Sequence, residues 1–139
     1  MVDSQQNVKK DRPVYKNIGL AQLIKYRLPW AGKVSILHRI SGAVLFLLLP
    51  FILYLFDQSL ASELSYQNFQ AFTGNILVKI ICLGLIWCFL HHFCAGIRYL
   101  LLDLEIGVEK SEANRSAIVV LFLGIALTAV VGLKLFGVY

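Results

Sequence analysis

Apolar residues occur in three long blocks along the chain. The first runs without a charge from Ala43 to Phe56, the second spans Ile76 to Leu102, and the third spans Ala117 to Leu133. A helix needs about 20 mainly apolar residues to cross roughly 30 Å of hydrocarbon. The second and third blocks reach that length, and the first does so only if the preceding segment SILHRISG, residues 35–42, belongs to the same helix. The pattern therefore predicts three membrane-spanning helices and places SILHRISG at the start of the first.

Composition favours a membrane protein over a soluble one. Of the 139 residues, 58% are hydrophobic and only 15% are charged, and the mean hydropathy is +0.72. Ordinary soluble domains are about half apolar and about a quarter charged, so a soluble bundle of buried helices is the weaker alternative. We expect an all-α membrane protein with a transmembrane domain at 33–139 and a basic N-terminal arm at 1–32 that has room for a short interfacial helix. The spans are predicted at about 33–56, 76–102 and 115–138.

Positive charge gathers at one side of the predicted spans. Eight of the thirteen Lys and Arg residues lie in residues 9–39, whereas the connector 57–75 has none and the connector 103–116 contains Lys110 and Arg115. Cytoplasmic flanks carry the excess of Lys and Arg, so the N-terminus and 103–116 are predicted to be cytoplasmic. The net charge of +5 is then a topology signal, and no nucleic-acid partner is expected.

Polar residues stand deep in the second predicted span, in the stretch HHFCAGIRYLLLD at 91–103. His92 lies eleven residues inward of Asp103, roughly 16 Å along a helix, which is near the middle of a bilayer. An ionisable residue at that depth is a functional-site hypothesis by default. The neighbouring His91 diverges by about 100° around the helix, so the two imidazoles cannot chelate one metal ion together.

Two interpretations of His92 remain open from residue types alone. Haem iron needs only one or two axial imidazoles, and Gly96, one turn after His92, would leave room for a porphyrin face. The alternative is a histidine whose hydrogen bonds are satisfied by a neighbouring helix. A proton relay is not favoured, because the spans contain no carboxylate between Asp57 and Asp103.

The start of the first span carries a complementary polar group. Ser35, Arg39 and Gly42 form one helical stripe, and His38 lies about 60° from Ser35. Arg39 and His38 could pair with anionic haem propionates, and Ser35 and Arg39 could hydrogen-bond the carbonyl oxygens of a quinone. The alternative is that these cations only snorkel from a helix end.

These segments resemble the cytochrome b membrane-anchor subunit of succinate dehydrogenase, the larger of the hydrophobic subunits in that complex. The similarity covers most of the chain and comprises four stretches in order. They are KKDRPV near the N-terminus, SILHRISG opening the first span, HHFCAGIRYLLLD closing the second, and NRSA opening the third. The pair of motifs SILHRISG and HHFCAGIRYLLLD, in this order on three predicted spans, is specific to that family.

The resemblance implies roles for individual residues. The family's H-x-x-x-G-I-R motif places the axial ligand of haem b at His92. Ser35 and Arg39 correspond to the family's quinone-contacting pair, and His38 corresponds to the histidine near the haem propionates. Tyr99 stands where some members have a second histidine, and the resemblance assigns no role to His91.

The implied function is that of the membrane-anchor subunit of succinate:quinone oxidoreductase, respiratory complex II. A flavoprotein subunit and an iron–sulfur subunit would oxidise succinate and pass electrons to ubiquinone or menaquinone at the anchor. This chain would contribute haem b and quinone binding but no succinate chemistry. Because it offers one well-placed histidine, the second axial ligand is expected from a second membrane-anchor subunit, so the three spans would belong to a larger helical bundle.

Two other functions and a location complete the expectations. The chain could instead anchor a fumarate reductase that works as a quinol oxidase, or serve as a small non-redox assembly or transport subunit. The predicted location is the bacterial cytoplasmic (inner) membrane. More than thirty polar and basic residues precede the first apolar run, and Asp3 and Asp11 are unlike a mitochondrial transit peptide.

Overall fold

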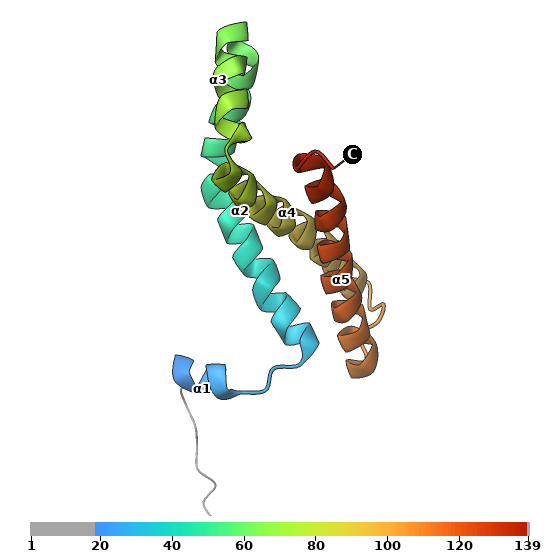
Figure 1. The fold of residues 1–139 in the computed structure, drawn as a ribbon. Coiled ribbons are helices and arrows are strands. Elements are labelled where there is room, and N and C mark those ends of the chain that lie inside the picture. Colours follow the sequence, from blue (N-terminus) through green and yellow to red (C-terminus); the bar gives the residue numbers. More distant parts are fainter. Residues whose placement is uncertain (1–18, 139) are drawn as a thin grey trace, which may run out of the picture.

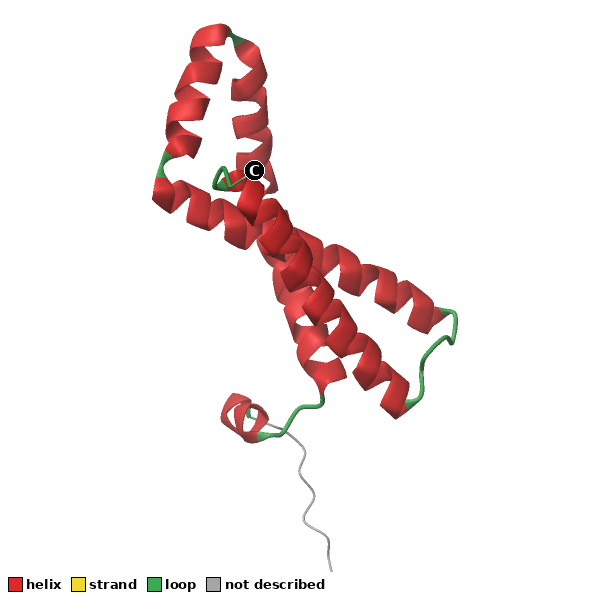
Figure 2. Ribbon diagram, turned by 45° about the vertical axis from the view of Figure 1, so that its right-hand side comes forward, coloured by secondary structure: helices red, strands yellow, loops and turns green. Residues whose placement is uncertain are grey.

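The computed structural model describes residues 19–138, and every regular element in that range is a helix (Figure 2). The predicted all-α class is confirmed for this part of the chain. The first eighteen residues of the predicted basic arm lie outside the described residues. The helices are α1 (Leu20–Lys25), α2 (Trp30–Ala61), α3 (Glu63–Gly74), α4 (Ile76–Asp103) and α5 (Lys110–Leu135).

Three of the helices are long and apolar enough to cross a membrane. They are α2, α4 and α5, with 32, 28 and 26 residues. At 1.5 Å per residue these lengths correspond to about 48, 42 and 39 Å, more than the roughly 30 Å of a hydrocarbon core. The expectation of three long apolar helices is confirmed. The orientation of the N-terminus and the exact membrane boundaries stay predictions.

The helix ends follow from local capping. Pro29 precedes α2 with an extended backbone, and the backbone N–H of Ala31 in the first turn donates to Oδ1 of Asn114 on α5 at 3.1 Å. The Ser62 hydroxyl accepts from the N–H of Ser65 at the start of α3, and the Asn75 side chain does the same for Leu77 in α4. Such caps satisfy N–H groups that have no partner inside the helix.

The long helices alternate in direction (Figure 1). At one end of the bundle, which we call the Trp30 end, α2 and α5 begin and α4 finishes. The short α3 folds back against the last part of α2 at the opposite end. Helix α2 itself continues to Ala61, beyond the predicted limit of the first span. Helix α4 packs against both α2 and α5. Its two faces therefore meet different neighbours.

Close packing between α4 and α5 depends on small residues. A Cβ atom added to Gly132 would lie only 2.8 Å from Cδ1 of Leu83, so the Leu83 side chain of α4 lies directly against the α5 backbone. Interfaces of this kind are typical of membrane helices, which associate by backbone approach and side-chain packing and not by exclusion of water. The other small residues that α5 buries are Ala117, Gly124 and Thr128.

The exterior of the bundle is apolar. In the most apolar stretches of α2 and α4 only 6% of the residues are buried, and large side chains such as Phe46, Phe89 and Phe122 are more than half exposed. A soluble protein rarely exposes apolar surface on this scale, whereas hydrocarbon solvates it. The structure therefore favours a membrane bundle over the alternative of buried soluble helices.

Candidate functional site

The adjacent histidines of α4 face different helices. His92 contacts α2, where its ring stacks on that of His38 with 4.2 Å between centroids and 11° between planes. His91 faces α5, where a Cβ atom added to Gly124 would lie 3.5 Å from its Cα atom. The divergence expected from the 100° step between neighbouring helical residues is thus confirmed.

His92 is held by a polar group between α2 and α4, well inside the bundle. Its Nδ1 atom lies 3.0 Å from the backbone carbonyl oxygen of His38 and 3.3 Å from Oγ of Ser41. Ser41 is buried, and its hydroxyl donates to the same His38 carbonyl at 2.9 Å. These contacts join α4 to α2 through three polar atoms in a mainly apolar bundle.

This geometry selects one tautomer of His92. A carbonyl oxygen only accepts hydrogen bonds, so the 3.0 Å contact places the proton on Nδ1. In a neutral imidazole the lone pair then lies on Nε2. No hydrogen bond within residues 19–138 uses Nε2 of His92. An imidazole whose Nδ1–H is bound to a backbone carbonyl and whose Nε2 is available is the usual form of a metal-ligating histidine.

Gly42, and not Gly96, makes room for His92. A Cβ atom added to Gly42 would lie 2.7 Å from Cε1 and 3.2 Å from Nδ1 of His92. A Cβ atom added to Gly96 would instead meet Nε2 of His38 at 3.8 Å, an ordinary contact. The space expected beside Gly96 is therefore occupied in part by His38. Helix α2 comes closest to the His92 ring at Gly42, one helical turn after His38.

The predicted stripe on α2 is divided between two surroundings. Gly42 faces α4, Ser35 is half-buried, and the Arg39 side chain is exposed. No side-chain hydrogen bond or ion pair joins Ser35 or Arg39 to another residue of the described chain. Their hydrogen-bonding groups are consequently available for a ligand or a partner.

Arg98 connects α4 to α5 closer to the Trp30 end of the bundle. It is buried, and its Nε donates to Oγ of Ser116 and its Nη2 to the carbonyl oxygen of Ala113, both at 2.9 Å. The ring of the next residue, Tyr99, lies 5.0 Å from that of His38. Arg98 therefore fixes the α5 side of α4, whereas Tyr99 belongs to the group around His38 and His92.

His91 is fully buried, with no hydrogen-bond partner for either ring nitrogen among the described residues. Its ring stacks on Trp87 with 5.2 Å between centroids. The packing around it leaves no exposed surface through which a large ligand would reach the ring. Of the two neighbouring histidines, only His92 is partly exposed.

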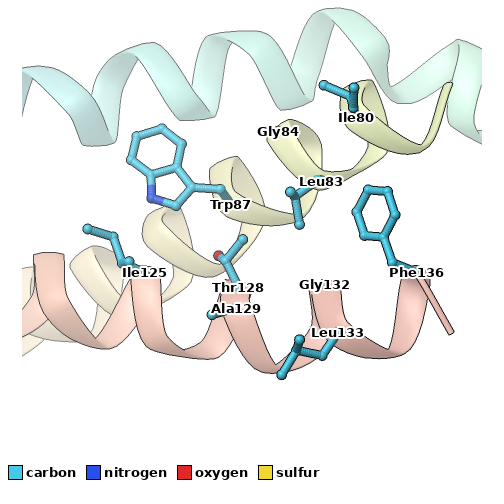
Figure 3. A pocket seen from close by; sticks show the side chains of 10 residues that line it. All are labelled: Ile80, Leu83, Gly84, Trp87, Ile125, Thr128, Ala129, Gly132, Leu133 and Phe136. Carbon is cyan, nitrogen blue, oxygen red and sulfur yellow. The ribbon is translucent and has the colours of Figure 1, made fainter. Parts of the chain in front are cut away.

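An open apolar groove of about 720 Å³ lies between α4 and α5, away from this polar group (Figure 3). The indole of Trp87 and the hydroxyl of Thr128 lie at its wall, and that hydroxyl donates to the carbonyl oxygen of Gly124 at 2.7 Å. The other lining residues are mostly aliphatic. Its lining suits an apolar group better than a polar ligand.

Two residues at the site were not singled out from the sequence as contacts of His92. Ser41 and Gly42 follow His38 by three and four positions, so they lie on the same face of α2. Both end the segment SILHRISG. That spacing is a usable signal, but it becomes informative only when α4 is known to be the facing helix.

Comparisons with known proteins agree with the predicted resemblance. Residues 9–131 match the family described as "Succinate dehydrogenase/Fumarate reductase transmembrane subunit". A succinate dehydrogenase cytochrome b556 subunit of Coxiella burnetii is 38% identical over 112 residues, which cover 78% of this chain and 90% of that protein. The same-named subunit of Paracoccus denitrificans is 31% identical over 114 residues, 82% and 87% of the two chains. That of Rickettsia felis is 25% identical over 128 residues, 92% and 96%.

These matches span nearly the whole chain, and they include the segments that hold His38 and His92. The family predicted from the two polar motifs is confirmed, as are the three apolar helices expected of it. The chain therefore belongs to the succinate dehydrogenase/fumarate reductase transmembrane subunits, within which it is a cytochrome b membrane-anchor subunit of succinate dehydrogenase.

Proposed function

We propose that this subunit binds haem b through Nε2 of His92 and forms part of a quinone-reduction site with Ser35 and Arg39. It then carries electrons between a succinate-oxidising assembly and the membrane quinone pool. The related subunits are named for cytochrome b556, which supports haem b as the cofactor. Bound haem b supplies reversible one-electron chemistry at iron, and the residues of this chain supply its attachment.

The observation that carries the proposal is the contact between Nδ1 of His92 and the His38 carbonyl oxygen at 3.0 Å. It leaves Nε2 with the lone pair that a haem iron needs. Residues 19–138 contain no group of three or more His, Cys, Asp and Glu side chains placed to hold a metal ion. The residues present therefore fit a group that requires one imidazole from this chain.

His38 and Arg39 are proposed to contact the haem propionates. The His38 ring lies directly against that of His92, and Arg39 is the next residue on α2, with an exposed side chain. A guanidinium can donate two parallel hydrogen bonds to a carboxylate. Both residues lie nearer than His92 to the Trp30 end, where charged propionates would reach the polar membrane surface.

Ser35 and Arg39 are one helical turn apart on α2. Neither side chain forms a hydrogen bond with another described residue. A quinone entering from lipid presents carbonyl oxygens that accept from a hydroxyl and a guanidinium. Ubiquinone and menaquinone both offer these groups, so the proposal covers either.

The complete assembly is proposed to contain a flavoprotein subunit, an iron–sulfur subunit and a second membrane anchor in a bacterial cytoplasmic membrane. A second anchor is proposed because the rings of His38 and His92 stack with 4.2 Å between centroids, so they cannot bind one haem iron from opposite sides. The N-terminus and the Trp30 end would face the cytoplasm, in line with the excess of Lys and Arg in residues 9–39.

The haem proposal is tested with two matched variants, His92→Phe and His91→Phe, in the purified complex. Both replace an imidazole by a phenyl ring at neighbouring positions. We expect His92→Phe to abolish the reduced-minus-oxidised absorbance of low-spin haem b and His91→Phe to retain it. An unchanged spectrum in the His92 variant would refute the assignment of the axial ligand.

The quinone proposal is tested by Arg39→Leu and Ser35→Ala, with Arg27→Leu as a control that removes an exposed cation outside α2. We expect quinone reduction to fall by about tenfold to a hundredfold in Arg39→Leu, the value of one hydrogen bond to a charged group, and by about twofold to tenfold in Ser35→Ala, the value of one between neutral groups. Succinate oxidation by an artificial acceptor should be retained in both. Equal loss of both activities would mean that these residues serve assembly. Menaquinol-dependent fumarate reduction as the faster reaction would reverse the proposed direction.

A further inference from the structure

We infer that Ser41 is a positioning residue for the haem ligand. Its hydroxyl would act together with the His38 carbonyl to hold the proton of His92 on Nδ1 and to keep Nε2 available to the iron. This inference rests on the proposed function and extends it from the ligand itself to the group that orients the ligand.

Three polar atoms between α2 and α4 form a connected group. The Ser41 hydroxyl donates its hydrogen to the His38 carbonyl oxygen at 2.9 Å. Its oxygen, 3.3 Å from Nδ1 of His92, can then only accept. The Nδ1–H group is therefore shared between two acceptors, the carbonyl oxygen at 3.0 Å and the hydroxyl oxygen. Shared bonds of this type are common near helix ends and at irregular contacts.

The surroundings keep the imidazole from turning away from this pair of acceptors. Ser41 is only 1% exposed, so water does not compete for its oxygen. The His38 ring covers one face of the His92 ring, and Gly42 lets the α2 backbone approach the ring edge. A second acceptor increases the electron density at Nε2, and loss of such an outer contact typically weakens metal binding by about tenfold to a hundredfold.

The ordinary role of a serine in a membrane helix is to bond back to its own backbone. Ser59 does this on the same helix, where its hydroxyl donates to the carbonyl oxygen of Phe56 at 2.6 Å. The sequence offset is three residues in both cases, but no imidazole lies beside Ser59 among the described residues. Ser59→Ala is therefore a matched control that removes the same backbone contact and nothing from the site.

The experiment compares Ser41→Ala with Ser59→Ala in the purified, haem-loaded complex. The rate of haem transfer to excess apomyoglobin reports retention of the ligand, and a redox titration reports the haem midpoint potential. We expect Ser41→Ala to release haem about tenfold faster and to raise the midpoint potential, because a less basic ligand stabilises ferric iron less. Ser41→Cys retains a weak acceptor of similar size and should give intermediate values, and it serves if the alanine variant does not assemble.

Three outcomes distinguish the positioning role from the ligand assignment. Faster haem release and a raised potential in Ser41→Ala, with Ser59→Ala unchanged, support the positioning role. Equal behaviour of the two serine variants, together with loss of haem in His92→Phe, overturns the inference on Ser41 but leaves the ligand assignment standing. Retention of haem in His92→Phe overturns the proposed function and the inference with it.

Discussion

Gly42 offers a sharp test of how closely α2 must approach the His92 ring. In Gly42→Ala the new Cβ atom would lie 2.7 Å from Cε1 of His92. Ordinary carbon–carbon contact begins at about 3.5 Å, so the ring would have to retreat by roughly 0.8 Å. The ring cannot retreat freely, because Nδ1 is bonded to the His38 carbonyl and the His38 ring covers one face.

The free energy of this change has two opposing parts. Replacing glycine by alanine inside a helix stabilises it by about 0.5–1 kcal/mol. Overpacking a well-filled contact costs about 1–3 kcal/mol. We therefore expect a net loss of about 0.5–2 kcal/mol, and a larger effect on the cofactor, because a ligand must stay within about 0.5 Å of its working position.

The assay combines haem content per complex with the melting midpoint of the complex. Gly84→Ala is the matched control, since it lies inside α4 and an added Cβ atom there meets no atom within 4 Å. We expect Gly84→Ala to keep its haem and melt at an equal or higher temperature, and Gly42→Ala to lose most of its haem. Full haem content and an unchanged spectrum in Gly42→Ala would show that His92 is not held as tightly as the contacts imply.

Three further substitutions test the packing around the site, each by the melting midpoint of the purified complex. His91→Phe should raise the melting midpoint and leave the haem content unchanged, because the substitution removes two buried nitrogens without partners, each costing about 1–3 kcal/mol. A fall in haem content would contradict this expectation. Arg98→Lys should destabilise the complex by about 1.5–3 kcal/mol, since an ammonium cannot replace both guanidinium hydrogen bonds. An unchanged midpoint would mean that these two hydrogen bonds do not stabilise the bundle. Glu105→Gly should stabilise by about 0.5–1 kcal/mol, because Glu105 has a φ of 61° that glycine adopts more easily, and a lower midpoint would mean that the side chain makes a needed contact.

Periodicity was sufficient to predict the helices and the separation of the two histidines. A helix turns by 100° per residue, so His91 and His92 had to face different sides of α4 whatever its neighbours were. The seven-residue spacing of His92 and Tyr99 likewise puts both on one face of α4, and both residues lie near His38. These expectations depend on one helix only.

The contacts between helices could not be predicted in the same way. Whether the space beside Gly96 stays open depends on how far α2 is shifted along its axis relative to α4. The observed shift places His38 beside Gly96 and Gly42 beside His92. Arg39 and Gly42 share a sequence stripe but meet different surroundings, because α4 contacts only part of it. The continuation of α2 to Ala61 and the return of α3 along it were likewise not predicted, because the apolar pattern marks only the uncharged run that ends at Phe56.

The arrangement of α4 leads us to expect that the proposed haem side of this subunit is completed by another chain. Helix α5 is used on the other face of α4, where His91 and Arg98 are buried, so it does not enclose His92. His38 and His92 remain half-exposed and Arg39 is exposed, although polar groups facing hydrocarbon are costly. A cofactor whose flat ring covers the imidazoles, with a partner helix on its far side, would remove that cost. The exposed polar cluster and the proposed second membrane anchor would thus have the same physical origin, and we expect this chain to be poorly stable alone.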